Sequence, residues 1–322
     1  MVECIVNPSS RSGRGAQIWH DLKTRFRMAG IEYREHLTDG PGAALRFSRE
    51  ITSAAPADGE DIRLVVLGGD GTLNEAVSGI ADFHNVLLGY IPTGSANDFA
   101  RGAQLPTDYN KLIDRIVTGK QTCRIDVGEL TYHNKTRTLS RLHDEPSGDT
   151  RRFVISAGIG FDAAVCEEAL SSNTKSFLNR IGLGKLTYGA IAIRQLLRAD
   201  KIGIHISMDQ AREMKLDHFL FAALMILPYE GGGFKFAPDA DGSDGVFNLC
   251  LVGDMTKPAM FRALLPAYFG KHYGIHGIYT YKTDNIRIKT ELPMWVHTDG
   301  EVMMKSDDIS LTCLKQVLRL MV

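Results

Sequence analysis

The chain has 322 residues, of which 44% are hydrophobic and 23% charged, and its formal net charge is −1. This length allows two domains with well-developed cores, and the composition is ordinary for a globular protein. A chain with almost no net charge has no overall attraction to nucleic acid or to an anionic membrane, so we expect no nucleic-acid partner.

The cysteines and the first eight residues indicate the cellular compartment in which the protein folds. Five cysteines are scattered along the chain, at Cys4, Cys123, Cys166, Cys250 and Cys313. An odd number without a Cys-x-x-Cys pair fits a reducing compartment. Residues 1–8 are typical of a short strand rather than a signal peptide, and no stretch reaches the roughly 20 apolar residues of a membrane span. We expect a cytoplasmic protein.

The first part of the chain alternates between strand-like and helix-like segments. Strands are predicted at 2–6, 31–37, 64–67 and 86–91, and helices at 16–29 and 42–54. This alternation predicts a parallel sheet covered by helices.

From about residue 124 the pattern changes. Strand-like runs lie at 124–129, 153–157, 203–208, 219–226, 246–252 and 285–289. A polar insertion at 133–150 and a mostly helical region at 163–199 separate some of them. Several strands with turn residues between them predict a second, mostly antiparallel domain.

The strongest local motif joins an apolar strand to a helix through Gly68-Gly69-Asp70-Gly71. Glycine lets backbone N–H groups come close to a ligand, and the helix start adds partial positive charge, which together suit a phosphate group. We expect Thr72 to cap this helix and Glu75 to complete a capping box. The alternative is a tight turn in which glycine serves only the backbone. The motif is not a Walker A loop, because no Gly-Lys-Ser/Thr follows.

Asp70 is the unusual residue of this turn. A carboxylate repels a phosphate unless a cation or a transferable proton lies between them, so Asp70 favours a Mg²⁺-nucleotide over a bare anion. The segment 89–101 repeats the arrangement of strand, turn and helix start, with the polar residues Ser95, Asn97 and Asp98. In a parallel sheet both loops lie at the carboxyl ends of strands, where ligands bind. Capping of a helix by Ser95 or Asn97 is the alternative.

Together the two segments resemble the diacylglycerol-kinase-like catalytic domain of bacterial lipid kinases, sphingosine kinases and ceramide kinases, with NAD kinases and phosphofructokinases as more distant relatives. The first segment matches the family's Gly-Gly-Asp-Gly-Thr motif residue for residue. The second matches Pro-x-Gly-Thr-x-Asn-Asp-Phe-Ala-Arg, except that Ser95 replaces Thr. Further landmarks at 157–162, 184–188 and 231–240 extend the resemblance over nearly the whole chain, although Ile226 stands where the family often has Asn.

The resemblance implies an ATP site in the first part of the chain. Asn7-Pro8 and Ser12-Gly13 are similar to the family's nucleotide loop, with two extra residues, and Thr38 stands where the family places a nucleotide-contacting Thr. The implied nucleotide-binding residues are Asn7, Ser12, Gly13, Thr38, Gly68, Gly69, Asp70, Gly71, Thr72, Asn74, Ser95, Asn97 and Asp98.

A first carboxylate cluster lies at 239–246. By itself it is compatible with a Ca²⁺ or Mg²⁺ loop or with a surface turn, and it falls short of an EF-hand because no Glu is at the twelfth position. The resemblance instead implies a structural Mg²⁺ site formed by the Asp244 carboxylate and the backbone carbonyls of Asp241 and Val246.

A second cluster lies at 296–302 and by itself resembles a polar turn between strands. The resemblance assigns the general base to Asp299 and a supporting role to Glu301, so that these two and Asp70 are the implied catalytic residues. A carboxylate within hydrogen-bond reach orients a lipid hydroxyl and takes its proton as the γ-phosphoryl group moves. We expect His297 to be structural.

The segment 169–199 has no Asp or Glu, and its Lys and Arg residues are interleaved with apolar ones. A basic amphipathic stretch of this kind can lie on an anionic membrane surface or pack as a core helix with a solvated face. The sequence leaves both interpretations open.

We predict a fold of class α/β plus mostly β. It has a three-layer α/β ATP-binding domain at 1–124, to which a strand at about 305–322 returns, and an antiparallel β-sandwich-like lipid-substrate domain at 125–304. The implied function is transfer of the ATP γ-phosphoryl group to diacylglycerol or a similar lipid, with Mg²⁺ as cofactor and only peripheral membrane contact. A soluble NAD-kinase-like phosphotransferase and a non-catalytic nucleotide-binding regulatory protein are the alternatives. A homodimer is compatible with the sequence.

Overall fold

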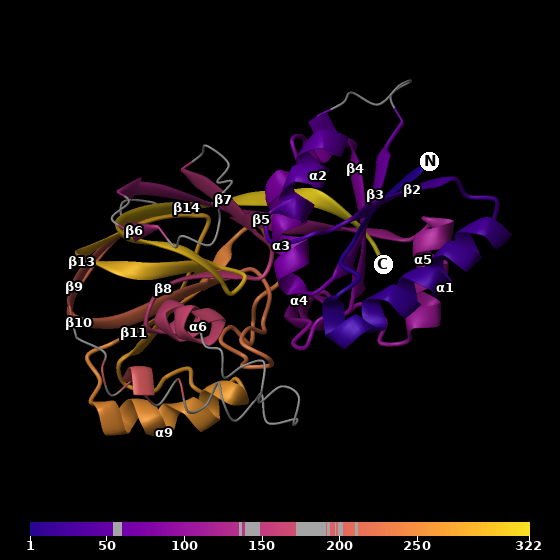
Figure 1. The fold of residues 1–322 in the computed structure, drawn as a ribbon. Helices are drawn as coiled ribbons and strands as arrows, with labels where there is room; N and C mark the ends of the chain where they lie inside the picture. Colours follow the sequence, from indigo (N-terminus) through magenta and orange to yellow (C-terminus); the bar gives the residue numbers. More distant parts are fainter. Residues whose placement is uncertain are drawn as a thin grey trace.

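The computed structural model describes residues 1–53, 60–134, 137–138, 149–171, 191, 194–196, 198, 202–209 and 212–322. In this part of the chain an N-terminal α/β domain lies beside a C-terminal β-rich domain, which confirms the predicted fold class (Figure 1). The polar insertion at 133–150 and the basic stretch at 169–199 fall mostly outside the described residues, so both interpretations of the basic stretch stay open.

Three short apolar strands and a more polar edge strand, β2 (Tyr33–Leu37), form the parallel sheet of the N-terminal domain. The apolar strands are β1 (Val2–Val6), β3 (Ile62–Gly68) and β4 (Val86–Pro92), and the order in the sheet is β4-β3-β1-β2. Val6 is level with Leu37 on one side and with Leu67 on the other. Because every pair is parallel, all four strands end at the same edge of the sheet.

Alternating side chains of β3 face two helix layers. The helices are α1 (Arg14–Met28), α2 (Ala43–Ser53), α3 (Asp70–Gly79), α4 (Asp98–Gly102) and α5 (Tyr109–Thr118), with short 3₁₀ helices at Ser10–Gly13 and Phe83–Asn85. Leu64 and Val66 pack with residues of α2 and α3, whereas Val65 and Leu67 pack with residues of α1 and α5. The strand therefore has the period-two alternation of a sheet buried on both faces, and the domain has three layers.

The C-terminal domain is built from antiparallel strands. They are β5 (Thr122–Asn134), β6 (Arg137–Thr138), β7 (Thr150–Phe153), β8 (Ser156–Gly160), β9 (Ile202–Met208), β10 (Arg212–Met225), β11 (Phe247–Gly253), β12 (Ile278–Thr283) and β13 (Asn285–Thr298). Two helices, α6 (Phe161–Ser171) and α9 (Lys257–Tyr268), lie on the same side of these strands (Figure 1). Met260 and Ala263 of α9 pack in one core with Cys250 and Val252 of β11.

One long strand, β14 (Glu301–Met321), belongs to both domains. Its first part pairs antiparallel with β13, and later residues pair with β5. Near its end Arg319 and Leu320 pair in parallel with Leu87 and Leu88 of β4. The described strands consequently form one hydrogen-bonded sheet that runs from β12 in the C-terminal domain to β2 in the N-terminal domain.

Several elements differ from the sequence-based expectation, among them α5 and β12, which were not predicted. A single strand was expected at 153–157, but β7 ends at Phe153 and β8 begins at Ser156, with a bend at Val154 and Ile155. The helix α9 was not predicted, although Thr256 accepts a hydrogen bond from the Ala259 amide and a proline stands in its first turn, both typical helix-start features.

Candidate active site

Polar residues or glycine follow each strand of the N-terminal sheet at the edge where all four strands end. Asn7 follows β1, Thr38 follows β2, Gly69 follows β3 and Thr93 follows β4. The Asn7 amide donates to the Thr72 hydroxyl at 3.2 Å, and the hydroxyls of Ser10 and Thr93 are 2.7 Å apart. These hydrogen bonds connect the loops that follow β1, β3 and β4.

Glycine in the turn after β3 allows close backbone contact with the turn after β4. A Cβ atom on Gly68 would lie 2.5 Å from the Thr72 Cβ, and one on Gly94 would lie 2.8 Å from the Gly69 Cα. There is no room for a side chain at either position, so the packing of the two turns requires glycine. Gly69 is also the N-cap of α3, which therefore lacks a side-chain cap and leaves the start of the helix suited to an anionic ligand.

The predicted capping box is wrong. The helix begins at Asp70, so Thr72 lies inside its first turn and cannot be the N-cap. The Glu75 carboxylate instead accepts from the amides of Gly42 at 2.8 Å and Ala44 at 3.2 Å, at the start of α2. Its partners lie in a different helix because the helix axes bring the side chain of Glu75 beside α2, a tertiary contact that sequence spacing cannot reveal.

Asp70 holds the loop after β4 against the loop after β3. Its carboxylate accepts from the amides of Asp98 at 3.1 Å and Phe99 at 3.4 Å, at the start of α4. Burial raises the pKa of Asp70 to about 6, and the negative charge of Asp98 adds to this effect. The site thus carries a buried negative charge that a cation would stabilise.

Asp98 connects the N-terminal domain to a glycine loop of the C-terminal domain. Its carboxylate accepts from the Gly232 amide at 2.8 Å and from Arg101 at 3.3 Å. Burial raises the pKa of Asp98, although the Gly232 amide and Arg101 oppose this. Gly232 has φ of 79°, a conformation that glycine adopts without strain.

Asp299 lies in the turn between β13 and β14, with φ of 51°. Its carboxylate accepts four N–H groups, from the Asn74 side chain at 2.9 Å and from the amides of Val154, Ile155 and Ser156 at 3.1, 2.8 and 3.0 Å. Burial raises the pKa of Asp299, and the four donors counteract this. The bend between β7 and β8 supplies three of these donors, which explains why the strand expected there is interrupted.

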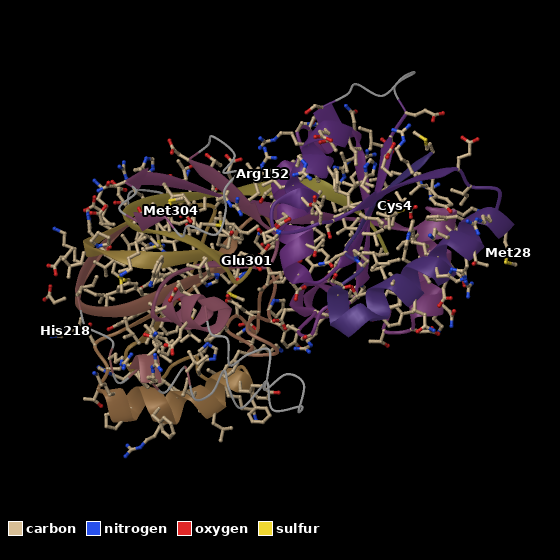
Figure 2. All side chains as sticks on the ribbon, viewed as in Figure 1. Cys4, Met28, Arg152, His218, Glu301 and Met304 are labelled. Atoms are coloured by element: carbon tan, nitrogen blue, oxygen red, sulfur yellow. The ribbon has the colours of Figure 1, made fainter. Side chains whose placement is uncertain are left out.

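Glu301 lies against the glycine turn. A Cβ atom on Gly71 would be 2.5 Å from the Glu301 Oε1 atom, so the carboxylate occupies the space that a side chain at position 71 would need. Figure 2 shows Glu301 between the two domains, beside the start of α3. The turn that follows β3 and the turn that precedes β14 are therefore in direct contact.

His297 is fully buried next to Asp299 and contacts two carboxylates. Its Nε2 atom is 3.1 Å from the Asp162 Oδ2 and 3.2 Å from the Glu230 Oε1, and its Nδ1 accepts from the Gly300 amide at 3.2 Å. Burial raises the pKa of Glu230 to about 7. His297 thus fixes the turn that carries Asp299, in agreement with the structural role expected for it.

Three other expected residues lie in the segments that follow β1 and β4. Ser95 is exposed in the loop after β4, Asn97 is the N-cap of α4 with φ of 53°, and Gly13 precedes α1 with φ of 94°. The buried Oδ1 atom of Asn97 has no hydrogen-bond partner. The Ser12 side chain lies outside the described residues, so its predicted role stays a prediction.

The expected metal loop has a partner other than a metal. The Asp244 carboxylate lies 2.9 Å from the Lys282 ammonium group and accepts from the Val246 amide at 3.2 Å, while Asp241 accepts from Ser243. Within the described part of the chain, no group of three or more His, Cys, Asp or Glu residues could hold a metal ion. The expected site uses one carboxylate and two backbone carbonyls, so this absence does not bear on it. The Mg²⁺ site at Asp241, Asp244 and Val246 stays a prediction.

Two family models cover most of the chain. Residues 2–130 match the model described as the diacylglycerol kinase catalytic domain, and residues 154–322 match the YegS C-terminal NAD kinase beta sandwich-like domain, which alone spans more than half of the chain. The chain belongs to the diacylglycerol kinase family of lipid kinases.

Similar proteins agree with this assignment over nearly their full length. The kinase is 28% identical to YtlR of Bacillus subtilis (strain 168) over 300 residues, which cover 93% of this chain and 92% of YtlR. It is 28% identical to the diacylglycerol kinase of Staphylococcus saprophyticus, with 92% and 87% of the two chains covered. The crystal structure of a diacylglycerol kinase from Bacillus anthracis has the same fold, with a TM-score of 0.68 at 19% identity and coverage of 99% and 96%.

Several residues of this kinase site were not identified from its sequence. The amides of Val154, Ile155 and Ser156 carry no side-chain signal, so no motif could have revealed them. Gly232 lies in the landmark at 231–240, but no role was assigned to its amide. Glu230 was passed over because only the glycines that follow it form a recognisable pattern. Thr93 directly precedes Gly94 in a recognised segment and could have been found as a hydroxyl at the end of a buried strand.

Proposed function

We propose that this family member is an ATP-dependent lipid kinase that transfers the γ-phosphoryl group to a hydroxyl of diacylglycerol or a similar lipid. The observation that carries the proposal is the Asn74–Asp299 hydrogen bond of 2.9 Å. It places a buried carboxylate of the C-terminal domain beside the start of α3, which is suited to phosphate. The family supports a lipid acceptor, and the names of its relatives support diacylglycerol.

ATP would bind at the carboxyl edge of the N-terminal sheet, with its phosphates against residues 68–72. The unpaired Oδ1 atom of Asn97 supports ligand contact there, since a buried acceptor without a partner is costly. The oxygen-rich donor set fits Mg²⁺, which keeps several waters and needs only one or two carboxylates together with phosphate oxygens. Asp70 would hold it. Bound Mg²⁺ would supply charge neutralisation for phosphate groups beside these acidic residues.

Asp299 would orient the lipid hydroxyl and take its proton while the new P–O bond forms and the bond to ADP breaks. Its two oxygens already accept four N–H groups, which is the capacity of a carboxylate. A hydroxyl must therefore replace one donor. Asn74 is the one side-chain donor among the four, and its amide also bonds the Arg152 carbonyl at 3.0 Å. We assign to Asn74 the role of releasing Asp299 when the acceptor enters.

A lipid acceptor requires contact with a membrane surface. Among the described residues, no helix is long and apolar enough to span a bilayer. The proposal therefore includes transient contact with the cytoplasmic surface of the inner membrane, with the acceptor entering from the bilayer.

The test is transfer of labelled γ-phosphate from ATP–Mg²⁺ to diacylglycerol, phosphatidylglycerol and soluble acceptors including NAD, with lipids presented in mixed micelles. Asp299→Asn is expected to lower kcat for the lipid by about 10²–10⁴-fold, the usual contribution of a general base. Asp308→Asn is the matched control, because Asp308 lies on β14 and pairs with Arg287 away from the site. Thermal unfolding of each variant separates loss of chemistry from loss of fold.

Each outcome decides a part of the proposal. Labelled lipid that disappears in Asp299→Asn but persists in Asp308→Asn supports it and names the acceptor. Label on NAD or another soluble acceptor alone would overturn the lipid assignment. Nucleotide binding without any transfer would show a regulatory protein and remove the role given to Asp299.

A further inference from the structure

The outer face of α9 is the largest concentration of exposed apolar side chains in the described part of the chain. Phe261, Leu265, Tyr268 and Phe269 are 55%, 68%, 42% and 60% exposed. Their spacing places them along one side of the helix, while Met260 and Ala263 on the opposite side are buried against β10 and β11. A contiguous apolar stripe of this kind marks a surface that binds another partner.

The charged residues in the sequence of α9 and the loop after it have one sign. No Asp or Glu occurs between Asp254 and Asp284, while Arg262 on the helix and Lys271 just beyond its end are exposed. An apolar face flanked by cations is typical of a helix that lies in the interface of an anionic bilayer. It does not favour pairing with a second copy, because a two-fold interface would place these cations opposite the same cations.

Aromatic contacts connect the end of this stripe to the candidate active site. The ring of Tyr268 is 5.3 Å from that of Phe234, and Phe234 stacks on Phe236 at 5.6 Å. The series continues to Phe221 at 6.1 Å and to Phe161 at 5.9 Å. Phe161 directly precedes Asp162, which bonds His297 beside the turn of Asp299. A series of packed aromatic rings, with Phe221 buried in the core, therefore extends from the exposed end of α9 toward the proposed base.

We infer that the outer face of α9, from Phe261 to Phe269 together with Arg262 and Lys271, is the surface by which the protein lies on an anionic lipid bilayer. This inference rests on the proposed function for its purpose, since a lipid acceptor must be taken from a bilayer. Bound there, the kinase would have Tyr268 and Phe269 at the level of the headgroups and the aromatic series leading from the bilayer to the site.

Vesicle co-sedimentation tests the surface without any phosphoryl transfer. Vesicles of phosphatidylglycerol and phosphatidylcholine are compared with vesicles of phosphatidylcholine alone. Leu265→Glu is expected to weaken binding to the anionic vesicles by at least about tenfold, because it removes an exposed leucine that the bilayer would bury and adds a repelled charge. Arg262→Glu is expected to weaken binding to anionic vesicles only. Leu292→Glu is the matched control, since Leu292 is 59% exposed on β13 and is expected to leave binding unchanged.

A kinase assay separates docking from chemistry. With a short-chain diacylglycerol below its micelle concentration, Leu265→Glu should retain the wild-type rate, while with vesicles its rate should fall with its binding. Unchanged vesicle binding in Leu265→Glu overturns the inference. So does a wild-type dimer that becomes monomeric in this variant while vesicle binding persists, because α9 would then be an interface between copies. Sedimentation does not require phosphoryl transfer. The vesicle result therefore tests the α9 surface even if the proposed kinase activity is not found.

Discussion

Two turns meet at the candidate site, and they differ in how much of their chemistry is local. The turn after β3 carries its properties in adjacent residues, because glycine backbone and a helix start create the phosphate-suited geometry. The turn before β14 depends on distant partners, since Asp299 is held by Asn74 and by the bend at Val154 and Ile155. Both turns contain an aspartate next to glycine. The surroundings of Asp70 can be predicted from adjacent residues, whereas those of Asp299 cannot.

Asp70→Asn tests the electrostatics of the first turn and has the largest expected effect. The raised pKa means that the folded protein binds a proton at Asp70 between about pH 4 and pH 6 that the unfolded chain has lost. Stability from this group therefore falls as pH rises through that window, by up to about 3 kcal/mol for a shift of about two units. Denaturant unfolding should show that the variant gains stability relative to wild type as pH rises from 4 to 7. If the stabilities of the variant and the wild type changed with pH in the same way, the result would contradict a raised pKa of Asp70.

Gly71→Ala breaks the contact between the turns. Its Cβ would lie 2.5 Å from the Glu301 Oε1, so the flexible carboxylate must move while the helix backbone is tolerant of alanine. We expect kcat to fall by about 10- to 100-fold, because a displacement of about 1 Å near the reacting groups is costly, with little change in melting temperature. Gly40→Ala is the control, because nothing lies within 4 Å of its added Cβ. Equal kinetics for the two variants would show that the contact has no role.

Asn74→Asp tests the role of Asp299 in the second turn, because it places a second carboxylate beside Asp299. The proposed base must be ionised, so the rate falls as pH falls through its pKa, which burial has already raised. A like charge raises the pKa further, and we expect the acidic limb of kcat/KM to move up by about one pH unit. Asn85→Asp makes the same change at an exposed amide and should leave the profile in place. An unmoved limb in Asn74→Asp would argue against Asp299 as the titrating base.

Glu75→Gln has the smallest expected effect. It removes one of two acceptors for the amides of Gly42 and Ala44, at a cost of about 1 kcal/mol, and should not change kcat. Glu50→Gln on the exposed face of α2 should change neither quantity. A large loss of activity in Glu75→Gln would show that this residue serves the ligand rather than α2.

The parts of the fold that sequence predicts are those with strong local periodicity. Strands such as β1 and β4 and helices such as α2 follow from apolar runs and amphipathic spacing, and their bounds agree within a few residues. The helix α9 was missed although its cap residue and first-turn proline are present, because its exposed apolar face disguises the amphipathic pattern. The bend after β7 was missed because its cause is a carboxylate that lies far along the chain.

The site divides in the same way. Family motifs led to Asp70, Asp98 and Asp299, and the structure joins the loops of Asp70 and Asp98 by hydrogen bonds. The sequence could not predict that Asn74 would bond Asp299 or that Glu75 would serve α2, because both depend on which helices become neighbours. Backbone donors such as the Val154 and Ile155 amides cannot be identified from residue types.

The strand β14 has a consequence for biosynthesis. Until Arg319 and Leu320 pair with it, β4 presents an open edge of the kind that invites association between nascent chains. Translation delivers the α/β domain first, but the strand that covers this edge arrives only after the β-rich domain has been made. Premature termination before residue 319 would therefore release a chain in which the edge of β4 stays uncovered.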